Sequence, residues 1–499
     1  MDHTDIPTSC TAALPSRNVG VCRRLQVAAM LLVTGQAIAA QLPPRYDRVI
    51  LGGHVMDPAS GLDAIRNVGI RHGRIAAITP QSVRGRDTID AHGLVVAPGF
   101  IDLHAHGQTP ETYRLQSLDG VTTALELEVG TGDIPAWYEE RRAGRLINFG
   151  ASIGHIPVRM QVMHDSGSFL PTGPAAYVEA TPAQIGDIAR RIEDGLAQGA
   201  VDVGAGFTYT PAANRSELLT VFRIAARAHV PVHVHIREGV AGLAEALGLA
   251  RESRASLHVV HLNSAGLGQT PAMLGLIAAA RRDGQDVTTE AYPYTAGMTE
   301  IRSATVQDTY RNAPDARLGE IEWPITGERL TRESFDRYSK IGGPVVLHRN
   351  TEEMVAQAIN SPLTMIASDA YWQNGAGHPR TTGTFSKVLG RYARDAQSLP
   401  LMDAIRKMTL SPAQRLAGRV PIMRRKGRVG VGSDADLTIF DAARIIDQST
   451  YREPSLAPTG IQFVLVNGVS VVSNGRPVNG VAPGRAVRAP SSRPSYGQR

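Results

Sequence analysis

The stretch TPAQIGDIARRIEDGLAQGAVDVGAGFTYTP, residues 181–211, predicts a helix that leads into a strand. Thr181 and Gln184 have the spacing of a capping box, and a proline fills the first helical position between them. Apolar residues follow at helical spacing until Gly199, which is expected to end the helix. The segment VDVGAGFTYTP that comes next is typical of a strand running into a loop.

This alternation of helix and strand recurs through the middle of the chain. Strand-like segments such as VPVHVHI and LTMIASDA lie next to residues with helical periodicity. About eight such units predict a parallel sheet closed into a (β/α)₈ TIM barrel, which we assign to residues 99–418. An open doubly wound sheet would show similar local patterns, but no G-x-G-x-x-G follows a strand. Residues 301–340 fit no such unit and are expected to form a lid or an insertion.

Both flanks of this α/β region are rich in short strand-like segments. Residues 41–98 alternate apolar and polar residues between Gly and Asp turns, and residues 419–482 repeat this pattern. We expect the two flanks to assemble into one small β-sandwich domain beside the barrel. The tail, residues 483–499, is rich in Pro, Ser and Arg and is predicted to be disordered.

Residues 1–40 have the pattern of a signal peptide. A pair of arginines precedes an apolar run, residues 25–40, that ends in the small residues AIAA. The run is shorter than the roughly 20 residues that span a bilayer, so cleavage is favoured over an uncleaved membrane anchor. We therefore expect a periplasmic or secreted protein that does not span the membrane after cleavage. Both cysteines, Cys10 and Cys22, precede the cleavage point, so the mature chain offers no thiol ligand.

The composition argues against several classes of function. A charged fraction of 20% and a hydrophobic fraction of 42% are those of a soluble globular protein. The net charge of +6 is spread over the chain, and aromatic residues do not interleave with the basic ones. The pattern of a nucleic-acid-binding protein is therefore missing, and a small-molecule partner is expected instead. The oligomeric state is left open by the sequence.

Histidines and an aspartate lie at the ends of four of the expected barrel strands. In FIDLHAHGQ, two histidines lie two residues apart, so they project from the same face of a strand. The carboxyl ends of the strands of a TIM barrel meet at one rim, where the active sites of these barrels lie. Imidazoles and carboxylates that converge there can bind a divalent metal such as Zn²⁺. The residues concerned are His104, His106, His235, His261 and Asp369.

These motifs and their order make the chain similar to the amidohydrolase superfamily. The segments that carry the likeness are VAPGFIDLHAH, GVTTALELEVG, HIREG, HLNSAG and ASDA. More narrowly, EAYPYTAGMT and HPRTTGTFSKVLGRYARD resemble the D-aminoacylase branch, the N-acyl-D-amino-acid deacylases. The resemblance extends from about residue 46 to residue 478. It implies a TIM barrel with one or two zinc ions and an enzyme that hydrolyses amide bonds.

The resemblance also implies roles for the residues at the strand ends. His104 and His106 match the metal-binding pair of the first strand. His235 and His261 match the ligands of a more tightly bound metal, and Asp369 matches the catalytic carboxylate.

Further residues are expected to contact the substrate. Tyr292 and Arg380 match residues that bind the α-carboxylate of the substrate in this branch. An arginine suits that role because its planar guanidinium meets a carboxylate through two parallel bonds. His155 follows a predicted third strand, and we expect it either to contact the substrate or to pair with a neighbour in the barrel mouth.

Two positions depart from the pattern of the D-aminoacylases. The branch commonly has a cysteine ligand at the end of the second strand, whereas this chain has TALELEVG there. Because a carboxylate can bind or bridge zinc as a thiolate does, we expect Glu128 to be the ligand, with Glu126 as the second choice. Asn263 stands where the branch often has a carboxylate-binding lysine, so it is a candidate substrate contact and the substrate class stays open.

The sequence therefore predicts metal-dependent hydrolysis of a linear amide, with N-acyl-D-amino acids as the expected substrates. The metal would acidify a water molecule and Asp369 would move its proton to the leaving nitrogen. No G-x-S-x-G elbow occurs, which argues against a serine hydrolase. Three alternatives stay open: a cyclic-amide hydrolase of the hydantoinase or dihydroorotase type, an isopeptide hydrolase, and a metal-binding barrel without catalysis.

Overall fold

The computed structural model describes residues 46–373 and 375–491. It contains eight parallel strands: β6 (Phe100–Asp102), β7 (Val121–Thr131), β8 (Asn148–Gly154), β9 (Val203–Gly206), β10 (Pro231–His235), β11 (Ser256–Val259), β12 (Val287–Ala291) and β17 (Thr364–Ile366). They form one sheet in the order β17–β12–β11–β10–β9–β8–β7–β6. The two end strands meet just beyond their carboxyl ends, where Ala105 pairs with Ala370 and the amide of His106 donates to the carbonyl of Ala370 at 2.7 Å. The predicted barrel is confirmed.

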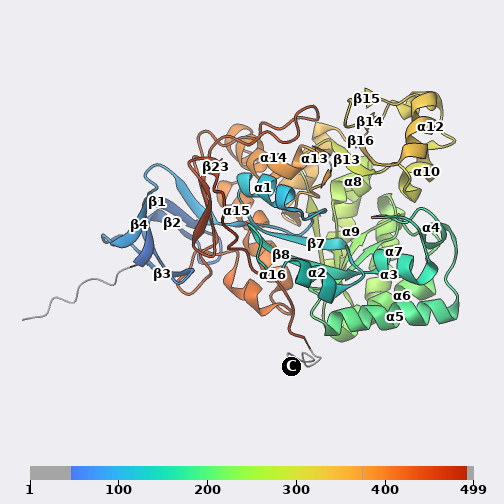
Figure 1. The fold of residues 1–499 in the computed structure, drawn as a ribbon, viewed down its shortest axis with the longest axis horizontal. Helices are drawn as coiled ribbons and strands as arrows, with labels where there is room; N and C mark the ends of the chain where they lie inside the picture. The colour runs from blue at the N-terminus through green and yellow to red at the C-terminus, as the bar shows by residue number, and fades with distance from the viewer. Residues whose placement is uncertain (1–45, 374, 492–499) are drawn as a thin grey trace, which may run out of the picture. The chain divides into compact units, whose positions relative to one another are not determined.

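Helices cover the outside of this barrel (Figure 1). They include α1 (Pro110–Leu118), α2 (Ile134–Glu140), α3 (His155–Met163), α4 (Pro174–Tyr177), α5 (Pro182–Ala197), α6 (Arg215–Ala228), α7 (Gly239–Ser253), α8 (Leu262–Gly266), α9 (Thr270–Arg282), α13 (Glu352–Asn360), α14 (Arg380–Lys387), α15 (Leu401–Met408) and α16 (Leu410–Leu416). The capping box of α5 forms as predicted, with Thr181 and Gln184 each accepting from the backbone amide of the other. Ile188, Ile192 and Leu196 of α5 are buried against the barrel, as the apolar spacing indicates.

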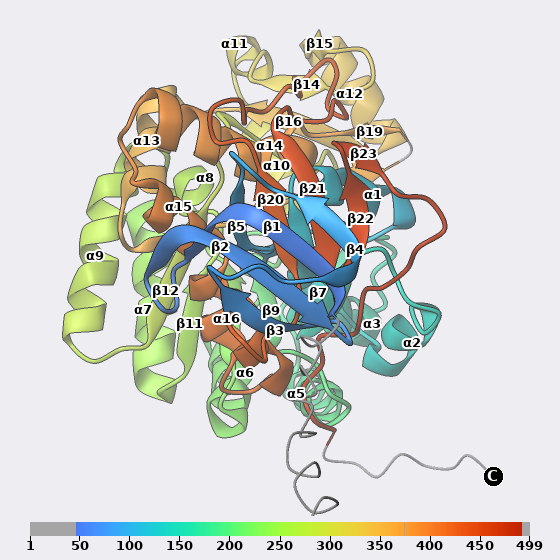
Figure 2. The same cartoon turned by 90° about the vertical axis from the view of Figure 1, so that its left-hand side faces the viewer.

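The two flanks of the chain form one β domain, as predicted. Its strands are β1 (Tyr46–Asp57), β2 (Leu62–Arg71), β3 (Arg74–Thr79), β4 (Gly85–Asp90), β5 (Val95–Pro98), β20 (Leu437–Phe440), β21 (Ile461–Val466), β22 (Val469–Ser473) and β23 (Arg476–Pro477). They belong to a single sheet in which β5 and β20 pair antiparallel and so join the two flanks. Figure 2 shows the N-terminal strands in blue beside the C-terminal strands in red. Val55, Val68 and Leu437 lie in a core of this domain.

An insertion follows β12 and ends before α13. It contains a sheet of β13 (Ala296–Glu300), β14 (Ile321–Trp323), β15 (Glu328–Arg329) and β16 (Pro344–His348), together with α10 (Ala304–Tyr310), α11 (Asp315–Leu318) and α12 (Arg332–Ile341). The insertion has its own core, in which Trp323 stacks on Tyr338 with ring centroids 4.0 Å apart. Figure 1 shows it as the yellow part at one end of the barrel, where the sequence predicts a lid or insertion.

The prediction of a disordered tail is wrong for residues 483–491. The amide of Val487 donates to the carbonyl of Phe149 at 2.7 Å, and the hydroxyl of Tyr138 donates to the carbonyl of Val487 at 2.7 Å. Val487 and Ala489 are buried with the side chains of the barrel strands, which compensates for ordering a segment rich in Pro and Arg. The remaining tail, 492–499, and the signal-peptide segment lie outside the described residues. Among the described helices, none is long and apolar enough to cross a bilayer.

Candidate metal centre and active site

Six side chains converge at the carboxyl end of the barrel strands. His104 and His106 follow β6, Glu128 lies on β7, His235 ends β10, and His261 and Asp369 follow β11 and β17, respectively. Their donor atoms form two groups, each within 4.8 Å. The structure therefore brings together all five residues predicted from strand ends, together with the predicted glutamate of the second strand. We call these six residues the metal cluster.

The first group of the metal cluster consists of His104, His106, Glu128 and Asp369. The Nε2 atoms of His104 and His106 are 3.0 Å apart, and Oε2 of Glu128 lies 2.8 and 3.1 Å from them. Oδ1 of Asp369 lies 3.4 and 3.3 Å from the same two nitrogens. Ligands that surround zinc tetrahedrally at about 2.1 Å are roughly 3.4 Å apart. The spacing therefore fits one divalent ion.

The second group shares Glu128 with the first. Its Oε1 atom lies 2.7 Å from Nδ1 of His235, and Nε2 of His261 lies 3.1 Å from the same nitrogen. Glu128 thus offers one oxygen to each group, which is how a carboxylate bridges two ions. This arrangement has room for the one or two metals expected from the sequence.

Two further carboxylates contact the outer nitrogens of the first histidine pair. Glu126 lies 2.9 and 3.1 Å from Nδ1 of His106, so it stands behind the ring rather than among the ligand atoms. Glu290 on β12 lies 2.7 Å from Nδ1 of His104 and 3.0 Å from Nε2 of His258. Such partners fix the orientation of metal-binding imidazoles. Sequence analysis missed Glu290, although an acidic residue within the buried strand VTTEA was a visible signal.

The electrostatics of the metal cluster favour a cation. Burial opposes ionisation of Glu128, but His104 and His235 outweigh it and lower the pKa of Glu128 well below its usual range. Burial and then the charge of His235 lower the pKa of His261 to about 3, so its imidazole is neutral and can donate a lone pair. Burial by itself lowers the pKa of His104, but the carboxylates of Asp369 and Glu128 outweigh burial and raise this pKa to about 10. A proton on His104 balances the charge of the buried carboxylates, which is the role that a bound metal ion would have.

The backbone is strained at two members of the metal cluster. His261 has φ of 30° and Asp369 has φ of 52°, both in the left-handed region that side chains other than glycine rarely adopt. Each such residue costs about 1–3 kcal/mol and persists only where the surroundings fix it. Both positions lie where a strand ends and the chain must turn its side chain toward the cluster.

Asp369 connects the metal cluster to Arg380. Nη2 of Arg380 lies 2.8 Å from Oδ2 of Asp369, and its Nε donates to the backbone carbonyl of Asp369 at 2.5 Å. Burial raises the pKa of Asp369, but Arg380 and His104 together lower it below the usual range. Arg380 also stacks over the ring of Tyr292 at 4.7 Å. Nη1 of Arg380 and the hydroxyl of Tyr292 are buried without a hydrogen-bond acceptor among the described residues.

Comparisons with known proteins agree with this geometry. Residues 87–472 match the amidohydrolase family. The chain belongs to this family. It is 31% identical over 495 residues to N-acyl-D-glutamate deacylase of Alcaligenes xylosoxydans xylosoxydans, and the match covers 90% of this amidohydrolase and 98% of the relative.

Solved structures of similar proteins contain metal. N-acyl-D-glutamate deacylase of Bordetella bronchiseptica, crystallised with zinc and a phosphonate inhibitor, matches with a TM-score of 0.76 and 27% identity, over 89% of this chain and 100% of that chain. A D-aminoacylase structure from work on its binuclear metal centre matches with a TM-score of 0.76 and 28% identity, over 89% of this chain and 100% of that chain. This amidohydrolase is a metal-dependent enzyme that acts on amide bonds, and the donor set of its cluster fits that role.

Two of the residues expected to touch substrate have other contacts in the amidohydrolase. Nε2 of His155 lies 2.7 Å from Oε1 of Glu217, which also accepts from Nε of Arg159 at 2.7 Å. The sequence left open whether His155 contacts the substrate or pairs with a neighbour in the barrel mouth, and in the structure it pairs with Glu217. Asn263 is buried and donates to the backbone carbonyl of Tyr292 at 3.2 Å, so it supports Tyr292 from behind.

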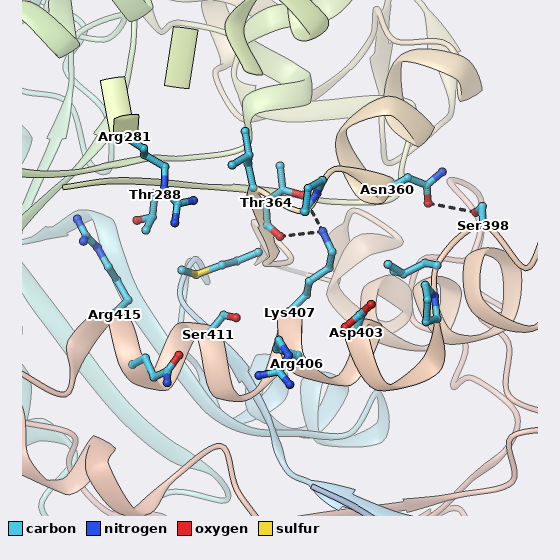
Figure 3. Close-up of a pocket in the computed structure, with 16 residues that line it drawn as sticks. Arg281, Thr288, Asn360, Thr364, Ser398, Asp403, Arg406, Lys407, Ser411 and Arg415 are labelled. Atoms are coloured by element: carbon cyan, nitrogen blue, oxygen red, sulfur yellow. Dashed lines mark hydrogen bonds between the residues drawn. The ribbon is translucent and has the colours of Figure 1, made fainter. Parts of the chain in front are cut away.

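A separate cavity of about 480 Å³ lies at the opposite end of the barrel strands. Its lining includes Thr288 and Thr364, at the starts of β12 and β17, and the side chain of Lys407. Figure 3 shows Lys407 reaching Thr364, whose carbonyl accepts at 2.9 Å and whose hydroxyl accepts at 3.1 Å; the carbonyl of Ser361 also accepts. The ammonium donors there are satisfied by the protein, so we place the chemistry of the amidohydrolase at the metal cluster.

Proposed function

We propose that this amidohydrolase removes the acyl group from N-acyl-D-amino acids. The observation that carries the proposal is the position of Asp369, which lies between His104 of the metal cluster and Arg380. One side of its carboxylate faces the nitrogens that would bind metal, and the other faces a guanidinium with an unused donor. An amide next to a carboxylate matches that pair of features. The names of the similar proteins, N-acyl-D-glutamate deacylase and D-aminoacylase, support the same substrate class.

The reaction adds water across the amide bond. The ligands for one ion would be His104, His106, Glu128 and Asp369, and for a second Glu128, His235 and His261. Divalent ions bound there polarise a carbonyl group and acidify water. Oδ1 of Asp369 accepts a proton from the attacking water, whose oxygen bonds to the carbonyl carbon. Asp369 returns the proton to the nitrogen as the C–N bond breaks, which releases a carboxylic acid and an amino acid.

The α-carboxylate of the substrate would bind next to Asp369. Nη1 of Arg380 and the hydroxyl of Tyr292 are two buried donors that find no acceptor within residues 46–373 and 375–491, and leaving such donors unpaired is costly. A substrate carboxylate would satisfy both and would position the scissile amide beside the metal cluster. Asn263 would act through Tyr292 by fixing its backbone.

A substrate panel tests the proposed function. Purified protein loaded with Zn²⁺ is assayed for release of amino acid from N-acetyl-D-amino acids and from their L enantiomers, and for opening of hydantoins to N-carbamoyl amino acids. We expect turnover of the D compounds above that of the L compounds and the cyclic amides. Turnover of hydantoins alone would favour the cyclic-amide alternative, and no turnover of any amide would disprove the proposal.

We also propose that the enzyme is exported and works in the periplasm or outside the cell. The support is the basic, apolar and small-residue pattern of residues 1–40. The N-terminal sequence of the protein recovered from the periplasmic fraction is the test. We expect it to begin near residue 41, and a full-length protein in the cytoplasmic fraction would contradict export.

A further inference from the structure

A cavity beside the metal cluster has one wall from the barrel and one from the insertion. His235, His261 and Asp369 lie at its base. The insertion contributes Met298, Leu347 and Arg349, and the barrel side contributes Leu267 and Glu238, among others. Asp369, which pairs with Arg380 of the proposed α-carboxylate site, lies at this base, so the remaining substituents of a bound substrate would face these two walls.

Glu238 and Arg349 join the two walls through a two-pronged ion pair. Nη1 of Arg349 lies 2.5 Å from Oε1 of Glu238, and Nη2 lies 2.9 Å from Oε2. Glu238 is the residue before α7, three positions after His235, and Arg349 follows β16 directly. The side chain of Arg349 is only 16% exposed, and that of Glu238 is 44% exposed.

The pair leaves no net charge on this part of the cavity. Glu238 raises the pKa of Arg349, and although burial opposes it, Arg349 lowers the pKa of Glu238, so both stay ionised near neutral pH. Two further charges nearby, Arg317 and Glu320, lie 3.4 Å from each other and also cancel. Of the other wall residues, Leu267, Met298 and Leu347 are apolar, and Thr299, Thr305 and Asn350 are polar but uncharged.

We propose that the Glu238–Arg349 pair is a specificity filter that selects amino acids with uncharged side chains. This inference rests on the proposed function and adds the class of side chain. An acidic side chain would find Arg349 already neutralised and would be repelled by Glu238. A basic side chain would find Glu238 already neutralised and would be repelled by Arg349. An uncharged side chain would pack on Leu267, Met298 and Leu347 without disturbing the pair.

Reciprocal variants test the filter. The ratio of kcat/KM for N-acetyl-D-glutamate to that for N-acetyl-D-methionine is measured in the wild type and in Glu238→Gln, which frees Arg349. We expect the wild type to favour the methionine compound and the ratio to rise about tenfold in the variant. In Arg349→Gln, which frees Glu238, the ratio for N-acetyl-D-lysine to N-acetyl-D-methionine should rise instead.

The opposite signs separate selection by charge from loosening of the insertion. A purely structural effect would move the acidic and the basic substrates in the same direction, and that result would overturn the filter. The matched control is Glu252→Gln at the other end of α7, which removes exposed pairs with Arg215 and Arg223 and should leave both ratios unchanged. A third arm varies the acyl group at constant side chain. If Glu238→Gln changed preference for acyl charge only, the pair would serve the acyl site and the proposal would be wrong. If no N-acyl amino acid were cleaved at all, the proposed function would fail first.

Discussion

Two buried groups of carboxylates and histidines lie in the mouth of this barrel, and they differ in how their charge is balanced. In the first, Glu217 is bound by Arg159 and His155, each at 2.7 Å, and one permanent cation matches one carboxylate. Among the described residues, the metal cluster and the side chains that support it hold four carboxylates, of which only Asp369 pairs with a permanent cation, Arg380; the other three, Glu126, Glu128 and Glu290, contact histidines.

This difference separates a structural group from a functional one. Both groups place a histidine just after a barrel strand, and both are buried. The charge of Glu217 is balanced by the protein alone, whereas the metal cluster needs a cation from solution. Charge balance, rather than residue type, therefore indicates which group performs chemistry.

The sharpest test of the comparison is Asp369→Asn. Loss of a general acid and base costs about 10²–10⁴-fold in rate, so we expect hydrolysis of N-acetyl-D-amino acids to fall by at least that lower factor. Three of the four donors in the Asp369 group of the metal cluster, His104, His106 and Glu128, stay in place and the asparagine keeps one side-chain oxygen, so the zinc content measured by elemental analysis should persist. A variant that keeps more than about a tenth of the wild-type rate would remove Asp369 from the reaction.

The Glu217→Gln variant should have a lower free energy of unfolding than the wild type and the same metal content. Arg159 would keep a buried charge without its partner, at a cost of about 3–5 kcal/mol in the free energy of unfolding. Urea unfolding measures the loss, and zinc content should equal that of the wild type. The control, Glu139→Gln, removes the exposed pair with Arg142 and should change stability by less than about 1 kcal/mol. Loss of zinc in Glu217→Gln would break the distinction between the two groups.

Glu290→Gln should weaken metal binding while the ligands themselves are unchanged. Removing a carboxylate that orients a metal-binding imidazole typically costs about 10–100-fold in affinity, and competition with a zinc chelator measures it. The matched control is Glu322→Gln, because Glu322 contacts His348 at 3.0 Å in the insertion and lies outside the metal cluster. Equal zinc affinities in the two variants would contradict a positioning role for Glu290.

The smallest expected effect is on stability in acid. Burial raises the pKa of Glu217, but His155 and Arg159 outweigh it, so the pKa in the folded protein lies below the ordinary 4.5. A carboxylate with a lowered pKa contributes its full stability above that ordinary value and loses it as the pH falls through the folded value. Between about pH 6 and about pH 3, the wild type should therefore lose more unfolding free energy than Glu217→Gln. Parallel pH profiles would contradict this.

The barrel and the ligand positions could be predicted because both follow from local periodicity. Alternation along a strand fixes which residues face the same side, and parallel strands bring their carboxyl ends together, so His235, His261 and Asp369 were found without coordinates. The structure places Glu128, the first choice from the sequence, in the cluster and Glu126 behind the ring of His106, because Glu128 is nearer the strand end.

Other features could not be read from the sequence, because they depend on pairings between distant segments. Which partner His155 faces depends on Glu217, 62 positions away. The contact of Glu290 with His104 joins residues 186 positions apart. Tail residues near Val487 are ordered by hydrogen bonds to Phe149 and Tyr138 and by packing on barrel side chains, which composition alone does not reveal.

The glutamate of the second strand has a chemical consequence of its own. Where a thiolate bridged two ions, peroxide could convert it to a sulfenic acid and disable the centre. Glu128 has no sulfur to oxidise, and the only cysteines of the chain lie at positions 10 and 22. The donor atoms of the metal cluster are oxygen and nitrogen, so the cluster offers no thiolate for which thiophilic ions such as mercury have a preference. This enzyme is therefore chemically suited to oxidising surroundings.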